Sequence, residues 1–486
     1  MALDDIRNER IKKLNALRHE KIEPYPAQST RTTTITDLLS RFEDASRETI
    51  AGRVMAIREH GGSLFCDLYD GTGRMQGYLK ENELGEKFKF FNSVVDIGDF
   101  IDLTGAPFTT KRGEKSLLAS DWRMLAKSIR PLPEKWHGIT DPEERLRRRY
   151  LDILFNDDVR TLIEKKSVFW NAVREFMRRH DFLEVETPVL ETITGGADAR
   201  PFTTHHNALA MDVFLRISGG ELWQKRLMVA GFPKVFEIGR IFRNEGMSAE
   251  HLQDYTQMEF YWAYADYTMG MAFVEELFKT VAEKTFGTLQ FSVNGHAVDL
   301  ARPWQRYNYQ ETVKRITGID VLAVTEEDVR NKLDDLHIEY QEDGFNMTRA
   351  LDNLWKYCRK QIAGPGFLVD VPTVVSPLSK RHPEDPRIAE RFQPIIGGTE
   401  LGNGFSELND PLDQHARFEE QQRLREAGDE EAHMADDEYV EALEYGMPPT
   451  CGFGMSERVF AFFAGRPIRE TQIFPLMRPR TSREEE

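Results

Sequence analysis

Hydrophobic and polar positions change their period several times along the 486 residues, and each change predicts a different kind of element. Between residues 50 and 125, short β-rich runs are separated by turn residues, which is typical of a small β-barrel such as an OB-fold. Barrels of this type bind single-stranded nucleic acid through exposed aromatic side chains and a basic rim. We predict its strands at 50–57, 63–69, 75–79, 100–105 and 116–124.

The segments on either side of the predicted barrel follow a helical pattern instead. Residues 1–18 are charged and helix-like, and a second short helix is predicted at 35–42. After a proline-containing linker at 130–135, residues at helical spacing between 162 and 176 predict an amphipathic helix. That helix leads into a predicted strand at 182–187. Later helices are expected at 417–427 and 438–444, joined by an acidic, solvated connection at 429–437.

Two strand-like runs, 235–242 and 255–261, flank a polar loop that opens with Phe242-Arg243-Asn244-Glu245. Because side chains alternate between the faces of a strand, Arg243 and Glu245 share one face. Arginine grips phosphate in a fork and an aromatic ring stacks on a base, so this hairpin suits a flat, phosphate-bearing ligand. Taken alone, the pattern also fits a surface hairpin with solvated charges. On the return strand one face carries Tyr255, Gln257, Glu259 and Tyr261.

Two glycine-rich segments favour the ligand-binding interpretation. The segment 452–458 contains glycines, which allow a backbone to approach a ligand closely, and ends in Arg458 before an apolar, helix-like run. In the segment 397–408, Asn403, Phe405 and Glu407 recur with a period of two. An apolar wall with an amide and a carboxylate predicts a pocket for a small ligand with an apolar stem and a cation. The alternative for such a segment is a strand whose glycines serve packing.

In this order the segments resemble those of the class II aminoacyl-tRNA synthetases, and most closely the lysyl-tRNA synthetases. Pro188 is similar to the proline of the first family motif, 242–245 to the second motif, and 454–458 to the third. The resemblance runs from about residue 50 to 479. The lysyl-type signals are the segments 195–202, 221–227 and 401–410.

The resemblance implies an α+β fold, with an N-terminal OB-fold barrel and a catalytic domain built on an antiparallel sheet flanked by helices. It also implies ATP-dependent ligation of L-lysine to the 3′ end of tRNA(Lys) through a lysyl-adenylate. The expected domains are an N-terminal helical extension at 1–48, an anticodon-binding barrel at 49–128, a linker at 129–145 and the catalytic domain at 146–486.

The resemblance also assigns an ATP site. Arg243 is expected at the α-phosphate and the lysine carboxylate, Arg458 at the γ-phosphate, and Tyr255 stacked on adenine. The catalytic residues are then Arg243, Glu245 and Arg458, and Glu245 and His251 hold the two ends of ATP. Mg²⁺ takes oxygen ligands, and the expected metal ligands are Glu400, Glu407 and Gln393. Glu400 also counts as an ATP-site residue.

Lysine selection requires a site for a buried cation. An ammonium is a compact, strongly hydrated charge, and burying it requires full pairing. The resemblance places Glu407 at the ε-ammonium, with Tyr261 and Phe405 flanking the methylene stem. Glu221 and Asn403 would hold the α-amino and carboxylate end. An aspartyl enzyme of the same class would need a cationic side chain where Glu407 stands.

In the barrel, Arg58, Phe65 and Gln76 are similar to the base-stacking and base-edge contacts that read the anticodon in lysyl enzymes. The alternative for Phe65 is a residue of the barrel core. The resemblance also implies a homodimer, formed through the amphipathic helix at 162–176 and the strand that follows it.

The chain departs from the family pattern near the phosphates. Glu250 stands where arginine is usual, and Gln393 where an acid is usual. We expect Glu250 to point away from the γ-phosphate, and the requirement for magnesium to be raised. Ser456 and Glu457 replace a usual glycine and aspartate. The changes at Glu250 and Gln393 support one rival hypothesis, a catalytically silent paralogue that binds tRNA or a partner. A second rival is an enzyme that attaches lysine to a protein, although such enzymes usually lack the barrel.

Composition restricts the class of protein and the cellular compartment to be expected. Apolar residues at 40% and charged residues at 30% describe an ordinary soluble protein, with no run long enough to span a membrane and no secretory signal. The three cysteines are far apart and favour a reducing cytoplasm over disulfides or zinc. The net charge of −17 alone argues against nucleic-acid binding. Local basic patches at 127–130 and 145–149 could still grip RNA, unless they are solvated faces or salt-bridge partners.

Overall fold

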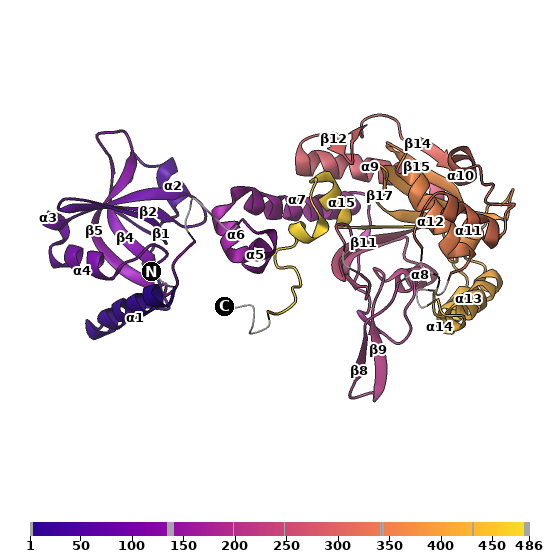
Figure 1. Ribbon diagram of the computed structural model, residues 1–486, viewed down its shortest axis with the longest axis horizontal. Coiled ribbons are helices and arrows are strands. Elements are labelled where there is room, and N and C mark those ends of the chain that lie inside the picture. The colour runs from indigo at the N-terminus through magenta and orange to yellow at the C-terminus, as the bar shows by residue number, and fades with distance from the viewer. Residues whose placement is uncertain are drawn as a thin grey trace. The chain divides into compact units, whose positions relative to one another are not determined.

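The computed structural model describes residues 3–133, 140–197, 199–246, 248–340, 342, 345–429 and 432–480. The chain forms two compact units, Met1–Thr140 and Asp141–Glu486, and each is described here by itself (Figure 1). The boundary between them falls within the predicted linker at 129–145. Three regions named in the predictions lie partly outside the described residues. They are the linker, the segment 195–202 at Asp198, and the end of the predicted catalytic domain.

The first unit is a closed five-stranded barrel with the strand order β1-β2-β3-β5-β4. All of the strands predicted there are confirmed. On β2, alternate residues Leu64, Cys66 and Leu68 are buried in the barrel core, as a period of two requires. Leu17 and Leu38 from the N-terminal helices join this core. The elements are α1 (Leu3–His19), α2 (Ile35–Ser40), β1 (Glu48–His60), β2 (Ser63–Tyr69), β3 (Arg74–Lys80), α3 (Glu81–Leu84), α4 (Glu86–Val94), β4 (Phe100–Thr109) and β5 (Lys115–Ala126).

The second unit is built on a nine-stranded sheet with the order β14-β15-β16-β18-β19-β11-β10-β6, in which β17 pairs with β16. Its neighbours are antiparallel except for the pairs β10–β6 and β14–β15. The expected α+β fold is therefore confirmed. The strands are β6 (Leu183–Glu184), β10 (Lys234–Phe242), β11 (Asp254–Ala263), β14 (Gln305–Asn308), β15 (Gly366–Pro372), β16 (Ile388–Ile396), β17 (Thr399–Glu400), β18 (Asn403–Ser406) and β19 (Thr450–Ser456).

Two long helices, α7 (Asp157–Arg179) and α9 (Tyr267–Phe286), pack together and cover the sheet. The predicted amphipathic helix is confirmed as α7, where Phe169, Val173 and Phe176 are fully buried. The strand predicted at 182–187 is shorter than expected, since β6 has only two residues. Beyond it the backbone N–H of Thr187 donates to the carboxylate of Glu237 (3.0 Å) instead of extending the sheet.

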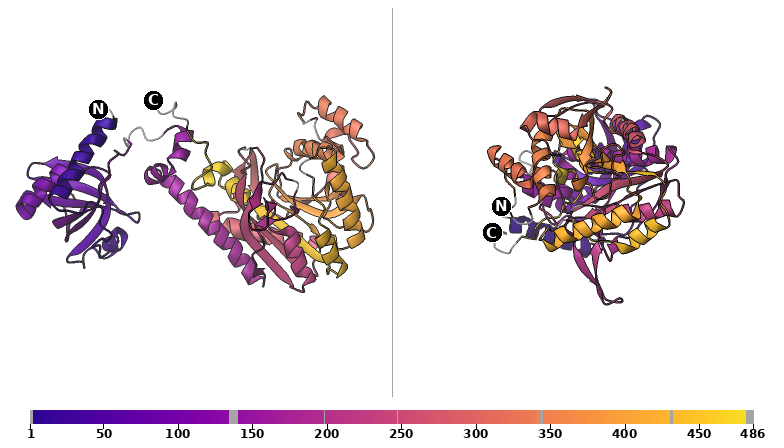
Figure 2. Two further views of the ribbon diagram at one scale, coloured as in Figure 1. Left: turned by 90° about the horizontal axis from the view of Figure 1, so that it is seen from below. Right: turned by 90° about the vertical axis from the view of Figure 1, so that its right-hand side faces the viewer.

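Smaller elements surround the main sheet (Figures 1 and 2). A helical subdomain of α10 (Tyr309–Thr317), α11 (Glu326–Asp335) and α12 (Met347–Arg359) packs around its own apolar core. A separate sheet has the order β7-β9-β8. The other elements are α5 (Pro142–Arg147), α6 (Arg149–Phe155), β7 (Leu190–Glu191), β8 (Thr203–His206), β9 (Met211–Leu215), α8 (Glu221–Val229), β12 (Gln290–Val293), β13 (His296–Asp299), η1 (Thr373–Val375), α13 (Pro411–Glu426), α14 (Asp437–Glu444), α15 (Arg458–Phe463) and η2 (Ile468–Thr471).

The acidic connection between α13 and α14 is not the solvated segment that its composition predicted. Asp429 is buried and pairs with Arg349 of α12 (2.8 Å), and Asp436 is buried and pairs with Arg226 of α8 (3.0 Å). Cations of neighbouring elements compensate part of the cost of burying these acids. The prediction is therefore wrong for these described residues, because acidic composition alone does not reveal such partners.

The basic run 145–149 forms ion pairs within its own helices. Arg149 is buried and contacts Asp152 (2.6 Å), and Arg145 contacts the same carboxylate (2.9 Å). In the barrel unit, Lys127 is likewise buried against Asp99 (2.7 Å). These residues fit the salt-bridge alternative to an RNA-binding patch. Within the described residues, no helix combines the length and apolarity that crossing a membrane requires.

Candidate active site

The centre of the sheet forms the floor of a pocket, because three neighbouring strands place small or functional side chains in register. Phe405 of β18 lies beside Gly452 of β19, which lies beside Tyr261 of β11. The next row along the strands is Asn403, Gly454 and Glu259. Residues two apart share a face of a strand, so all these positions face the same side of the sheet.

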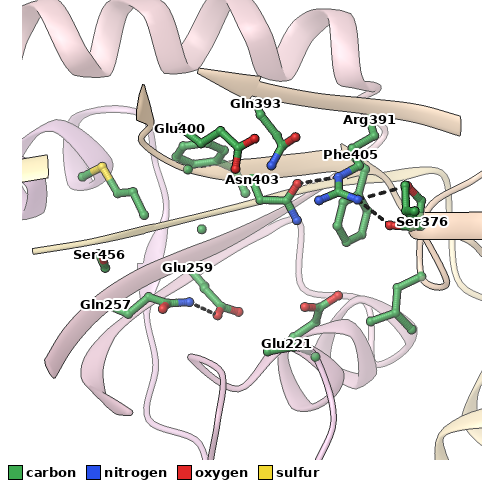
Figure 3. A pocket seen from close by; sticks show the side chains of 18 of the residues that line it. Glu221, Gln257, Glu259, Ser376, Arg391, Gln393, Glu400, Asn403, Phe405 and Ser456 are labelled. Atoms are coloured by element: carbon green, nitrogen blue, oxygen red, sulfur yellow. Dashed lines mark hydrogen bonds between the residues drawn. The ribbon is translucent and has the colours of Figure 1, made fainter. Parts of the chain in front are cut away.

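Glycine in the middle strand creates the depth of the pocket. A Cβ atom added at Gly452 would collide with the Glu407 carboxylate and come within 2.5 Å of the Tyr261 ring. The resulting cavity is about 560 Å³ and is lined by residues of the predicted lysine and ATP sites. The hypothesis that these glycines serve a ligand pocket is consistent with this geometry (Figure 3).

Helix α8 adds the wall of the lysine end of the pocket. The helix begins after Gly220, whose φ of 80° places it in the left-handed region that suits glycine. Glu221 and Lys225 are one helical turn apart, and Lys225 Nζ donates to Glu221 Oε1 (2.7 Å). The same ammonium lies 2.5 Å from Glu407 Oε2, and the side chains of Lys225 and Glu407 are completely buried. Sequence reasoning missed Lys225, although its i,i+4 spacing from Glu221 was visible.

Glu259 is a third acid of this end that sequence reasoning did not assign to the site. Its residue is 4% exposed, and Oε1 accepts hydrogen bonds from the N–H of Gly219 (2.6 Å) and from Gln257 Nε2 (2.5 Å). In Figure 3 the carboxylates of Glu221 and Glu259 both point into the pocket. The signal was its place between Gln257 and Tyr261 on one strand face, at the same period of two.

The buried acids of the lysine end are not fully compensated by nearby positive charge. Burial and the neighbouring Glu221 raise the pKa of Glu259 to about 7. Burial also raises the pKa of Glu407 well above its usual range, although Lys225 opposes the shift. Burial alone would lower the pKa of Lys225, but Glu221 and Glu407 raise it, so this ammonium stays charged. Glu221 and Glu407 thus share one resident cation, and Glu259 accepts from the neutral donors Gly219 and Gln257, which leaves the pocket suited to a cationic ligand.

Asn403 is oriented by an arginine that the sequence did not identify. Arg391 of β16 donates from Nε to Asn403 Oδ1 (2.8 Å), and its Nη1 donates to the carbonyl of Val375 (2.6 Å) and to Ser376 Oγ (3.1 Å). The Asn403 amide nitrogen is therefore turned away from Arg391 and is available as a donor (Figure 3). No periodic pattern links residues 391 and 403, so only the pairing of β16 with β18 could reveal this contact.

At the opposite end, the predicted ATP residues also line the cavity. Arg243 follows directly after β10, and its guanidinium carbon lies 5.9 Å from the centre of the Tyr255 ring. Arg243 Nε donates to the carbonyl of Ile217 (3.2 Å), which fixes the base of the side chain. Glu245 lines the same cavity, and its backbone carbonyl accepts from Gln253 Nε2 (3.0 Å). The structure thus brings together the pair that period two predicted.

Glu250 pairs with an arginine of the predicted triphosphate site. Its Oε2 atom lies 2.7 Å from Arg458 Nη2, so the carboxylate turns toward the arginine assigned to the γ-phosphate. In this structure Glu250 thus faces the partly buried guanidinium of Arg458, and the expectation that it points away from a bound γ-phosphate stays a prediction. His251 lines the cavity beside them, and burial together with Arg458 lowers the pKa of its imidazole. The lowered pKa favours the neutral ring, which can interact through hydrogen bonds.

The oxygens expected to bind magnesium are partly in place. Gln393 and Glu400 point into the same part of the pocket (Figure 3), and Trp355 Nε1 donates to Glu400 Oε1. Glu407 instead contacts the Lys225 ammonium at the other end. No three His, Cys, Asp or Glu side chains cluster as metal ligands anywhere in the described ranges. Mg²⁺ usually takes one or two carboxylates plus substrate phosphates and water, so Glu400 and Gln393 together fit such an ion.

The residues predicted to read the anticodon lie on the barrel unit and not among those that line the pocket. Phe65 is only partly buried and stacks on Tyr78, with ring centres 4.5 Å apart. The alternative that Phe65 belongs to the barrel core is wrong, because its neighbours Leu64 and Cys66 fill the core. Arg58 pairs with Asp67 (2.8 Å) on the barrel surface. Gln76 Oε1 accepts from Ser116 Oγ (3.1 Å).

Comparison with known proteins agrees with this geometry. The family model described as "tRNA synthetases class II (D, K and N)" matches residues 141–478, and an OB-fold nucleic acid binding domain matches residues 48–125. A lysine–tRNA ligase of Thermotoga maritima is 43% identical, covering 100% of this chain and 98% of that protein. A lysine–tRNA ligase of Carboxydothermus hydrogenoformans is 44% identical, covering 98% and 99% respectively.

Proposed function

The chain belongs to the class II tRNA synthetases and, within them, to the lysine–tRNA ligase family, and on this premise we propose which of its residues perform the reaction. The enzyme attaches L-lysine to the 3′ end of tRNA(Lys) and consumes ATP. The lysine carboxylate attacks the α-phosphorus of ATP, which forms lysyl-adenylate and releases pyrophosphate. A terminal ribose hydroxyl of tRNA then takes the lysyl group and releases AMP.

The observation that best supports lysine as the substrate is the excess of acidic side chains at the buried end of the pocket. Glu221 and Glu407 pair with one resident cation, Lys225, while the third acid, Glu259, accepts from the neutral donors Gly219 and Gln257. Neither carboxylate oxygen of Glu407 accepts a hydrogen bond of good geometry from the described residues. A ligand with two ammonium groups supplies the missing charge and the missing donors. Tyr261 and Phe405 are buried beside Glu407 and suit the methylene stem between those groups.

We assign the α-amino group to Glu221 and Glu259, and the carboxylate side of lysine to the amide donor of Asn403. Arg243 then lies where the carboxylate meets the α-phosphate. Two anions react there, and a positioned arginine neutralises the charge that grows in the transition state. Glu245 and Tyr255 hold the adenine, and Arg458 holds the γ-phosphate.

A magnesium ion is the expected cofactor of the triphosphate end. Bound beside the phosphates, it would neutralise their charge. Glu400 would hold it through the oxygen that Trp355 does not occupy, and Gln393 would contribute a neutral amide oxygen. Gln393 binds such an ion more weakly than a carboxylate does, which supports a raised magnesium requirement.

We also propose a homodimer in the cytoplasm. The first-motif region carries exposed apolar side chains, including Val168 of α7 and Leu183 of β6. Such a patch on helix and strand suits a two-fold contact between copies. All three cysteines are buried free thiols, which suits a reducing compartment.

The decisive experiment is ATP–pyrophosphate exchange measured with each standard amino acid, with and without tRNA. The expected result is exchange that depends on lysine and proceeds without tRNA. Absence of exchange with every amino acid favours the silent paralogue. Exchange with lysine but transfer to a protein rather than to tRNA favours the protein-modifying rival.

The barrel should contribute only to the tRNA step. Phe65 and Tyr78 present stacked rings on its surface, where an anticodon base can continue the stack. Replacing Phe65 with Ala should weaken tRNA charging and leave lysine-dependent exchange unchanged. Equal loss of both reactions would contradict an anticodon role and indicate a folding defect.

A further inference from the structure

The ion pair between Glu250 and Arg458 stands at the triphosphate end of the pocket and has no role in the assignments above. Glu250 lies in the loop between β10 and β11, and Arg458 begins α15. Their nearest atoms are 2.7 Å apart, with the Arg458 side chain 22% exposed and the Glu250 side chain 46% exposed. A mostly buried cation is thus covered by an acid that reaches it from the solvent side.

The backbone that carries Glu250 is held in place, whereas its side chain is accessible. The N–H groups of Glu250 and His251 both donate to Ser248 Oγ (3.1 Å each). The carbonyl of Ala249 accepts from the N–H of Ile468 (2.9 Å), which fixes the turn to η2. The carboxylate can therefore leave Arg458 by side-chain rotation, without rearrangement of the loop.

The pair neutralises Arg458 without satisfying it. Arg458 Nε and Nη2 are buried, and neither donates a hydrogen bond of good geometry to a described residue. Glu250 is the single carboxylate within 4.0 Å of this guanidinium in the described part of the chain. A phosphate has three oxygens and can take donors in the forked arrangement that Arg presents. Charge contact without matched donors is what an easily displaced counter-ion provides.

We propose that Glu250 is a built-in counter-anion of Arg458, which the terminal phosphates of ATP displace when they bind. This inference rests on the proposed function, since it takes the same pocket to be the ATP site. The free enzyme then divides between a closed form, in which Glu250 covers Arg458, and an open form. Because ATP binds the open form, its apparent affinity is reduced by the fraction of enzyme that is open. Glu250 thereby sets the ATP concentration that the enzyme needs.

The sign of the effect separates this role from its main alternative. If Glu250 instead helped to hold ATP through a bound cation, removing its charge would weaken ATP binding. As a counter-anion its removal strengthens ATP binding. AMP lacks the β- and γ-phosphates that reach Arg458, so its affinity should not change under the proposal.

The test measures binding of ATP and of AMP by calorimetry, without lysine, to the wild-type chain, Glu250→Gln and Glu250→Ala. The matched control is Asp254→Asn, which removes a charge from the same hairpin, where Asp254 pairs with Arg240 (2.5 Å) and does not line the cavity. Half-exposed ion pairs are weak, so we expect the Kd for ATP to fall about two- to fivefold in both Glu250 variants. The Kd for AMP, and both constants of the control, should stay unchanged.

Exchange kinetics give a second readout. The KM for ATP should fall in the Glu250 variants, whereas kcat and the KM for lysine should stay within about twofold of the wild-type values. An unchanged or raised Kd for ATP in the Glu250 variants overturns the proposal, and so does an equal gain for AMP. A wild-type chain that binds no ATP and shows no exchange overturns the proposed function itself. The two failures are therefore distinguishable.

Discussion

The two ends of the pocket differ in burial, and the difference separates what is fixed in this enzyme from what is adjustable. At the lysine end, the side chains of Lys225 and Glu407 are 0% exposed. At the triphosphate end, Glu250 and Arg458 are 46% and 22% exposed. Charges in a dry site interact strongly and cannot be re-solvated, whereas half-exposed charges are screened and exchange partners. Substitutions should therefore have large effects at the lysine end and small effects at the triphosphate end.

The largest effect is expected for Glu407→Gln. Removing one member of a buried charge pair costs about 2–5 kcal/mol, or roughly 30-fold to several thousand-fold in kcat/KM for lysine. Lysine-dependent exchange measures it, and Glu420→Gln on the exposed face of α13 is the control. Near-normal KM and kcat in a folded Glu407→Gln variant would show that the ammonium binds elsewhere.

Arg243→Ala lies between the two ends and should lose about 100- to 1000-fold in kcat for exchange, since its contact strengthens as charge builds on the phosphorus. Thermal melting should change little, because the side chain lines a cavity. The control Arg240→Ala removes an arginine from the same hairpin that pairs with Asp254 instead. Normal exchange by a folded Arg243→Ala variant would refute the assignment.

Much of the pocket floor could be predicted from the sequence, because side chains alternate between the two faces of a strand. This alternation placed Asn403, Phe405 and Tyr261 correctly because all three lie on regular strands of the sheet. The five barrel strands were found because short β-rich runs are separated by turn residues. A residue's neighbours along its own strand or helix are visible in a sequence, and these determined the floor of the pocket.

Contacts between distant elements were not visible. Lys225 meets Glu407 across 182 positions, the difference between their residue numbers, and Arg391 meets Asn403 only through the pairing of β16 with β18. The ion pair between Glu250 and Arg458 was not predicted either, although both residues were expected near the γ-phosphate, because the sequence does not show which way a side chain turns. The residues that the sequence missed or misjudged are those whose partners come from another part of the fold.

The pH dependence of lysine binding should reveal the raised pKa of an acid at the buried end. The pKa of Glu259 is about 7, above its usual range because of burial and Glu221. An acid with a raised pKa is ionised above pH 7 and gains a proton below it, and a diammonium ligand prefers the ionised form. The KM for lysine should thus rise as pH falls from 8 to 6, by up to about tenfold per unit.

Glu259→Gln is the diagnostic variant for this profile. It should bind lysine more weakly at pH 8 and show a flatter dependence on pH, because the titrating group is gone. The KM for ATP serves as the internal control, since the triphosphate end lies apart from Glu259. A profile that is flat in the wild type, or equally steep in both proteins, would contradict the role of Glu259.

The smallest effect is expected for Gln393→Glu, at the triphosphate end of the comparison. Gln393 and Glu400 point into the same part of the pocket, and Trp355 occupies one oxygen of Glu400, so the wild type offers magnesium one free carboxylate oxygen and one neutral amide oxygen. A second carboxylate should lower the magnesium concentration for half-maximal exchange a few-fold, with kcat at saturating magnesium unchanged. Gln422→Glu on the surface of α13 adds the same charge away from the pocket and should have no effect. No change in Gln393→Glu would remove Gln393 from the metal site, and a wild type without exchange at any magnesium concentration would favour the silent paralogue.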